Sequence, residues 1–253
     1  MTGAGTAQPG AGRELRSVEE IAALTGGDTL VLWAAQGLER GGRAWAGEDA
    51  VISAAPAIST RDRAAVWARS PQAAAALARE VLPQLPRSFR PFGDRPVIEA
   101  VAAAVPGLEV VGRFGWMDAR ETAPPEAPAE WLTDVDAEAV SGILDRAYPI
   151  SYARPGVTGV THWAGIRDDA GRLLAVGALA WPSPQVSLLS GIAVDPSARG
   201  KGLALPLCAT LAHAALATHD AVALMVEDAN TSARRVYERL GLHHRPVAAA
   251  AFA

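Results

Sequence analysis

Residues 192–204 read IAVDPSARGKGLA. The stretch begins as an apolar strand, turns at a proline and then carries two basic residues interleaved with two glycines. Glycine adopts positive φ readily and lets a ligand approach the backbone closely. Where such a turn opens a helix, backbone N–H groups and the helix N-terminus direct partial positive charge at an anion. Arg199 and Lys201 add full charges, so the stretch predicts a pyrophosphate site.

The residues after the lysine distinguish between kinds of phosphate loop. A Walker-type loop needs Ser or Thr after Gly-Lys, whereas Gly202 stands there. A dinucleotide fingerprint needs a third glycine at the position of Leu205. The remaining pattern, Arg199-x-x-Gly202-x-Ala204, resembles the acetyl-CoA pyrophosphate loop of the GNAT acetyltransferase superfamily. The alternative is an ordinary strand-to-helix turn that contains two glycines.

A second motif follows the apolar run 221–226. It reads Asn230-x-x-Ala233-x-x-x-Tyr237-x-x-x-Gly241, with a helix-capping residue at its start and a glycine where a helix C-cap belongs. This also resembles the GNAT pattern, in which the asparagine contacts the pantetheine arm and the tyrosine lies near the cofactor sulfur. The alternative for Tyr237 is an aromatic residue on the apolar face of an amphipathic helix.

The resemblance implies acetyl-CoA (CoA) as cofactor and a set of residues that bind it. These are Ile192, Ala193, Val194, Arg199, Gly200, Lys201, Gly202, Leu203, Ala204, Asn230, Ala233 and Tyr237.

The implied reaction is transfer of acetyl to a primary amine by direct attack in a ternary complex. A phenol beside the sulfur can return a proton to the departing thiolate, so Tyr237 is the expected catalytic acid. The general base is not evident, because the strand 186–194 lacks the glutamate that many GNAT members carry there. A water relay, His162 and Glu227 remain open.

The expected acceptor wall is the loop 148–156, which reads YPISYARPG. Trp163 and Trp181 could line it, although each also fits a core position. The expected acceptor is a small-molecule amine or a peptide N-terminus. The alternative function is a non-catalytic CoA-binding or regulatory module.

The expected fold class is α/β (α+β), with a mixed, splayed sheet flanked by helices in a catalytic GNAT domain at 131–253. Apolar periodicity predicts helices at 131–148 and 203–215, and strands at 162–166, 173–181, 186–194, 221–226 and 243–252.

The first half predicts a smaller α/β domain at 13–119, preceded by a disordered segment 1–12 and followed by a proline-rich linker 120–130. Strands are expected at 29–34, 50–54, 64–68 and 108–115, helices at 71–82 and 96–105, and a hairpin turn at Gly41-Gly42. No phosphate loop occurs there. The order of elements resembles the degenerate N-terminal domain of the glycine N-acyltransferase branch, which implies a GNAT-like partner domain without cofactor.

Composition and charge limit the kinds of partner that we expect for this protein. A net charge of −4 over 253 residues argues against nucleic acid as the main partner, and no apolar run is long enough for a membrane span. The histidines lack a metal-ligand spacing, so no metal is expected, and the single cysteine, Cys208, fits a core position. The start of the sequence lacks a signal-peptide pattern, which favours a cytoplasmic protein. We expect a monomer (a pseudo-dimer of two similar halves) or a homodimer.

Overall fold

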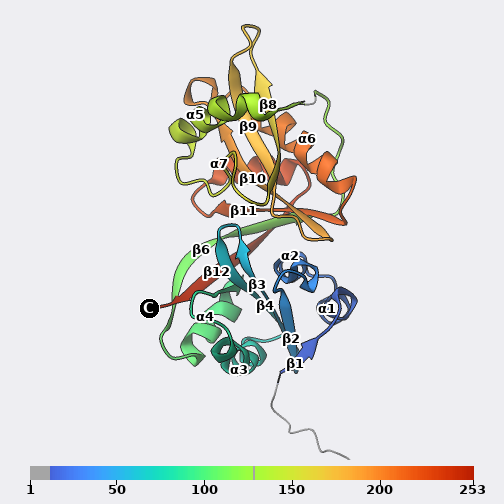
Figure 1. Ribbon diagram of the computed structural model, residues 1–253, viewed down its shortest axis with the longest axis vertical. Coiled ribbons are helices and arrows are strands. Elements are labelled where there is room, and N and C mark those ends of the chain that lie inside the picture. Colours follow the sequence, from blue (N-terminus) through green and yellow to red (C-terminus); the bar gives the residue numbers. More distant parts are fainter. Residues whose placement is uncertain (1–11, 128) are drawn as a thin grey trace, which may run out of the picture.

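The computed structural model describes residues 12–127 and 129–253 (Figure 1). The expected disordered segment therefore lies outside the described residues except for Gly12. The first half contains β1 (Arg13–Leu15), α1 (Val18–Thr25), α2 (Thr29–Ala35), the 3₁₀ turn η1 (Gln36–Leu38), β2 (Arg43–Gly47), β3 (Ala50–Ile58), β4 (Arg61–Ala68), α3 (Pro71–Val81), η2 (Leu82–Gln84), β5 (Arg90–Asp94), α4 (Arg95–Ala104) and β6 (Leu108–Ala119).

The second half repeats much of this order. It contains β7 (Glu130–Trp131), η3 (Asp134–Asp136), α5 (Ala137–Ala147), β8 (Val160–Arg167), β9 (Leu173–Ala180), β10 (Val186–Val194), η4 (Pro196–Ala198), α6 (Ala204–Leu216), β11 (Ala221–Glu227), α7 (Thr231–Arg239) and β12 (His243–Phe252). Within the described ranges, no helix is long and apolar enough to cross a membrane.

The strands of the described residues join one 12-stranded mixed sheet in the order β1-β2-β3-β4-β5-β12-β6-β11-β10-β9-β8-β7. Each strand of the first half has a counterpart in the second, β1 with β7, β2 with β8, and so on to β6 with β12. When the names of the counterparts are swapped, the strand order reads the same from the opposite edge of the sheet. Each half also contains one parallel pair at the equivalent place, β4 with β5 and β10 with β11. The chain is therefore a pseudo-twofold pair of similar halves, and the expected mixed α/β architecture is confirmed.

The two halves exchange their last strands. β6 of the first half pairs with β11 of the second half, and β12 of the second half pairs with β5 of the first half. β6 and β12 pair with each other from His243 opposite Asp118 to Phe252 opposite Leu108. In Figure 1 these two long strands, green and red, pass side by side through the middle of the molecule. The sheet is thus continuous across both halves.

Residues 29–34, predicted as a strand, instead begin the helix α2. Every residue from Thr29 to Ala35 is buried, and such a continuous apolar run fits a fully buried helix as well as a buried strand. The deciding residue is Asp28, whose side chain accepts a hydrogen bond from the backbone N–H of Val31 at 3.0 Å and caps the helix. Arg245 of β12 forms an ion pair with the same carboxylate.

Two smaller predictions also differ from the structure. The Gly41-Gly42 turn connects η1 to β2 instead of two strands, so it is not a hairpin. The helix predicted at 131–148 starts later, because Trp131 pairs in β7 and Thr133 caps η3 in a capping box. The other predicted helices and strands are confirmed, with ends shifted by a few residues; β6 extends to Ala119 and β3 to Ile58.

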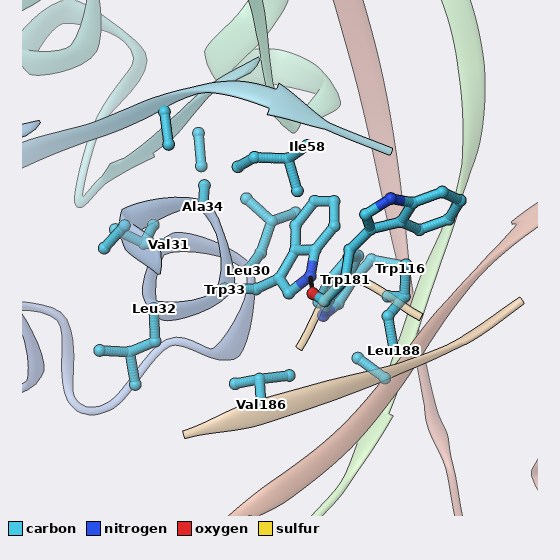
Figure 2. Packing of buried hydrophobic residues seen from close by; sticks show 14 of the residues in the cluster. Leu30, Val31, Leu32, Trp33, Ala34, Ile58, Trp116, Trp181, Val186 and Leu188 are labelled. Atoms are coloured by element: carbon cyan, nitrogen blue, oxygen red, sulfur yellow. Dashed lines mark hydrogen bonds between the residues drawn. The ribbon is translucent and has the colours of Figure 1, made fainter. Parts of the chain in front are cut away.

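Trp33 on α2 lies at the centre of the core that joins the halves (Figure 2). Its ring is fully buried and packs against Phe92 and Trp116, with ring centroids 6.2 and 5.6 Å away. Its indole Nε1–H donates a 2.8 Å hydrogen bond to the backbone oxygen of Trp181, directly after β9. One side chain of the first half therefore satisfies a buried backbone group of the second.

Trp33→Ala is expected to lower the free energy of unfolding by about 3–5 kcal/mol, because it opens a large cavity and leaves a buried carbonyl without its donor. Urea denaturation measures this loss. Trp131→Ala is the matched control, since Trp131 is 46% exposed on the edge strand β7. Equal losses in the two variants would contradict the assigned role of Trp33.

Candidate functional site

The basic, glycine-containing stretch lies between the end of β10 and the start of α6, as predicted. Its first part is held by Asp195, which accepts hydrogen bonds from the backbone N–H and the hydroxyl of Ser197 at 3.0 and 2.6 Å. Arg146 of α5 donates to the same carboxyl group at 2.7 Å. Ser197 and then Arg146 hold the pKa of Asp195 well below its usual range, so the carboxylate stays charged.

The second part of the stretch is exposed and open. Gly200 and Gly202 have φ of 78° and 77°, a left-handed conformation that favours glycine. A Cβ added at either position would meet nothing within 4 Å, so packing within the chain does not explain these glycines. The exposed side chains of Arg199 and Lys201 flank them, and Leu203 and Ala204 open α6. The backbone conformation is thus that of an open cradle at a helix N-terminus.

Beside this cradle the sheet splays. The pairing of β10 with β11 runs from Val186 opposite Ala221 to Leu189 opposite Leu224 and stops there. A bulge between Ser190 and Ala193 then shifts the register of β10 against β9. β10 continues to Val194 without β11 beside it, so the side of residues 192–194 that does not pair with β9 is a free edge facing the gap between the strands. Such an edge can pair with an extended ligand.

Gly191 makes the bulge possible. Its φ is 62°, and an added Cβ would come within 2.8 Å of the Trp163 ring. Trp163 therefore packs over the bulge and is a positioning residue of the splay, partly buried against the core.

The second motif forms α7 and its cap. The Asn230 side-chain oxygen accepts a 3.1 Å hydrogen bond from the backbone N–H of Ala233, which fixes the start of the helix. Tyr237 lies on the inner face of α7, only 7% exposed, in the same apolar cluster as Cys208 of α6. Burial raises the pKa of Tyr237 well above its ordinary value, and Cys208 and Tyr148 raise it further.

Tyr148, at the start of the loop 148–156, interacts electrostatically with Glu227 at the end of β11 and with Tyr237 of α7. Burial raises the pKa of Tyr148, and the charges of Glu227 and Tyr152 contribute to this rise. Tyr148 in turn acts on Tyr237. Of the open candidates for the base, Glu227 lies close enough to Tyr148 for its charge to raise the pKa of that residue. His162 lies elsewhere, exposed on β8 with its ring 6.0 Å from that of Trp131.

The structure adds a residue that sequence reasoning missed. Arg61, at the start of β4, donates from Nε and Nη2 to the hydroxyl of Tyr152 at 3.0 and 2.7 Å. The β3–β4 hairpin of the first half therefore contacts the acceptor loop of the second half. The two residues are 91 positions apart, so no local pattern could have indicated this contact.

The equivalent place in the first half differs in two ways. Only Arg69 and Ser70 separate β4 from α3, whereas residues 195–203 separate β10 from α6. The Ser70 hydroxyl caps α3 directly, accepting from the backbone N–H of Ala73 at 3.2 Å. In addition, the buried helix α2 occupies the position at which the second half has the loop 148–159.

Comparisons with known proteins agree with this geometry. Residues 165–249 match the family described as FR47-like protein, and no curated relative matches the sequence of the chain. The fold is similar to that of a GCN5-related N-acetyltransferase from Kribbella flavida, with a TM-score of 0.57 and 18% identity, covering 89% of this chain and 96% of that one.

A GNAT-family protein from Novosphingobium aromaticivorans gives a TM-score of 0.52 at 22% identity, covering 82% and 90% of the two chains. A GCN5-related N-acetyltransferase-like protein from Streptococcus suis gives 0.51 at 11% identity, covering 93% and 98%. The resemblance to the GNAT superfamily is thus confirmed: residues 165–249 match a GNAT-related family model, and the chain as a whole has the fold of GNAT proteins.

Proposed function

We propose that this protein is an acyl-CoA-dependent N-acyltransferase that transfers acetyl from acetyl-CoA to a primary amine by direct attack in a ternary complex. The observation that carries this proposal is the open cradle at residues 199–202, next to the splay between β10 and β11. Two left-handed glycines that no intramolecular contact requires, flanked by two exposed cations, fit a pyrophosphate.

In this proposal the two motifs bind different parts of the cofactor. Arg199, Lys201 and the backbone N–H groups of Gly200 to Ala204 bind the pyrophosphate. The free edge of Ile192, Ala193 and Val194, together with Asn230 and Ala233, binds the pantetheine arm. Bound acetyl-CoA supplies an activated thioester carbonyl, and the backbone N–H groups of the same edge can orient that carbonyl.

Tyr237 acts as the general acid. Because burial raises its pKa, its hydroxyl keeps its proton throughout the neutral and mildly alkaline pH range. It can therefore return a proton to a departing thiolate, since a free thiol has a pKa of about 8.5.

Glu227 is the proposed general base. It is exposed at the end of β11, where solvent can accept the proton. Its charge raises the pKa of Tyr148 in the proposed acceptor loop. The carboxylate would accept a proton from the incoming ammonium group directly or through a water molecule.

The pseudo-twofold sheet within one chain supports a monomer as the working unit. The net charge of −4 argues against nucleic acid as the acceptor, and we propose a small amine or a peptide N-terminus in its place. Assignment of the first half to the glycine N-acyltransferase type of degenerate domain remains an interpretation of element order. The alternative, a CoA-binding module without chemistry, is favoured by the lack of a glutamate in β10. Thiol release from acetyl-CoA with a panel of amines distinguishes the two.

Gly202→Asp is expected to weaken acetyl-CoA binding at least tenfold, because it places an anion against the pyrophosphate in a left-handed turn. Gly171→Asp is the matched control, since Gly171 has φ of 78° and open space around it but lies in the β8–β9 turn. Isothermal titration calorimetry measures both. Equal affinities in the two variants would exclude the loop as the pyrophosphate site.

Tyr237→Phe is expected to reduce turnover by about 10²–10⁴-fold while acetyl-CoA affinity stays nearly the same, because the ring remains and only the proton donor is lost. Steady-state thiol release and calorimetry provide the two values. A parallel loss of affinity and turnover would mean that the hydroxyl binds the pantetheine arm and is not the acid.

A further inference from the structure

Arg63 of β4 is a buried cation that forms no ion pair with a carboxylate among residues 12–127 and 129–253. Its side chain is 6% exposed in the core between the halves. Burial, and then Arg61 and Arg90, lower its pKa to about 10, while Tyr152 acts in the opposite direction. The guanidinium groups of Arg61 and Arg90 thus both lie within electrostatic reach of Arg63. A buried charge that lacks a counterion is costly, and an anion that binds beside it would offset that cost.

The surroundings of Arg63 fix its guanidinium group without neutralising it. The group lies 5.8 Å from the ring centroid of Trp33 and 5.6 Å from that of Phe92. Its Nε donates to the backbone oxygen of Ile58 at 3.1 Å, and its Nη2 donates to the Ser59 hydroxyl at 3.3 Å. Among the described residues nothing accepts from Nη1, so part of a rigid, planar donor fork remains available.

The nearest acid in the sequence does not fill this role. Asp62 alternates to the opposite face of β4, and its carboxylate accepts a 3.0 Å hydrogen bond from the backbone N–H of Ala57 in the hairpin. The Asp62 carboxylate therefore stabilises the β3–β4 turn.

Arg61, which lies near Arg63, contacts the proposed acceptor loop. Its guanidinium group hydrogen-bonds to the Tyr152 hydroxyl and lies 5.1 Å from the centroid of the same ring. Tyr152 is 43% exposed, so this place is accessible from solvent. Tyr152 raises the pKa of Tyr148, and Tyr148 raises that of Tyr237, so the Arg61–Tyr152 contact is linked to the proposed acid electrostatically through Tyr148.

We propose that the acceptor amine carries an oxyanion, a carboxylate or a phosphate, which Arg61 and Arg63 bind while the amine reaches Tyr148 and Tyr237. This deepens the proposed function and rests on it. The first half then supplies the specificity of a reaction whose cofactor is bound by the second half. Guanidinium groups suit both oxyanions because each can accept two parallel N–H···O bonds.

The test compares amines in matched pairs, β-alanine with propylamine and O-phosphoethanolamine with ethanolamine. The anionic member of at least one pair is expected to have a kcat/KM at least tenfold higher, and the preferred pair identifies carboxylate or phosphate. Arg61→Gln should remove this preference mainly through a higher KM. Arg69→Gln is the matched control and should keep it, because Arg69 also stacks on an aromatic ring, Trp67, but lies at the far end of β4.

Calorimetry with β-alanine and O-phosphoethanolamine, in the presence of CoA, separates this proposal from the proposed function. If no amine releases thiol but an anionic amine binds, and Arg61→Gln weakens that binding, the acyltransferase proposal fails and the oxyanion site stands. Equal kcat/KM within both pairs, or no binding of either anionic amine in a protein without turnover, would overturn the oxyanion site.

Discussion

The exchange of the last strands is the constraint on which the rest of the molecule depends. β6 hydrogen-bonds to β11 and β12 hydrogen-bonds to β5, so each half completes its sheet with a strand from the other. Without β12, β5 would expose an unpaired edge, and without β6 the same would hold for β11. Neither half can therefore form its full sheet alone. The exchange also sets the ends of β11 and β12 beside the first half, which brings Arg245 to Asp28 and Arg95 to Asp228.

The sheet is pseudo-symmetric, but the two halves differ in the region where we propose that the ligands bind. In the first half the β4–α3 connection is reduced to two residues, Arg69 and Ser70, and the buried helix α2 packs Trp33 into the core. In the second half the corresponding connection forms an open cradle, and the loop 148–159 leaves Tyr148 and Tyr152 partly exposed. The same topology thus gives a filled half and an open half. The β3–β4 hairpin of the filled half contacts this loop through the hydrogen bonds of Arg61 to Tyr152.

The sequence predicted those parts that neighbouring residues determine. The strand, cradle and helix at 186–216 follow from a short apolar run, a proline, two glycines and an apolar helical face. Asn230 predicts the N-cap of α7, and Gly241 predicts the left-handed conformation that ends the helix. In the first half, the residues of α2 were predicted as a strand. A continuous apolar run shows neither the helical nor the strand period of hydrophobicity, so the sequence alone does not distinguish the two.

The strand exchange and the contact of Arg61 with Tyr152 could not be predicted from the sequence, because they join residues far apart in the chain that carry no shared motif. The same reason explains why Glu227 was only one of several candidates for the base in the sequence. Its position relative to Tyr148 depends on how β11 meets the loop after α5, which local patterns do not determine.

The stoichiometry of acetyl-CoA binding tests most directly the idea of one open and one filled half. Calorimetric titration of the full chain should give one acetyl-CoA per chain, because only the second half has a cradle at a helix N-terminus in the described residues. A value of two per chain would show that the first half also binds the cofactor and would contradict this division of roles, and the absence of binding would contradict the cradle itself.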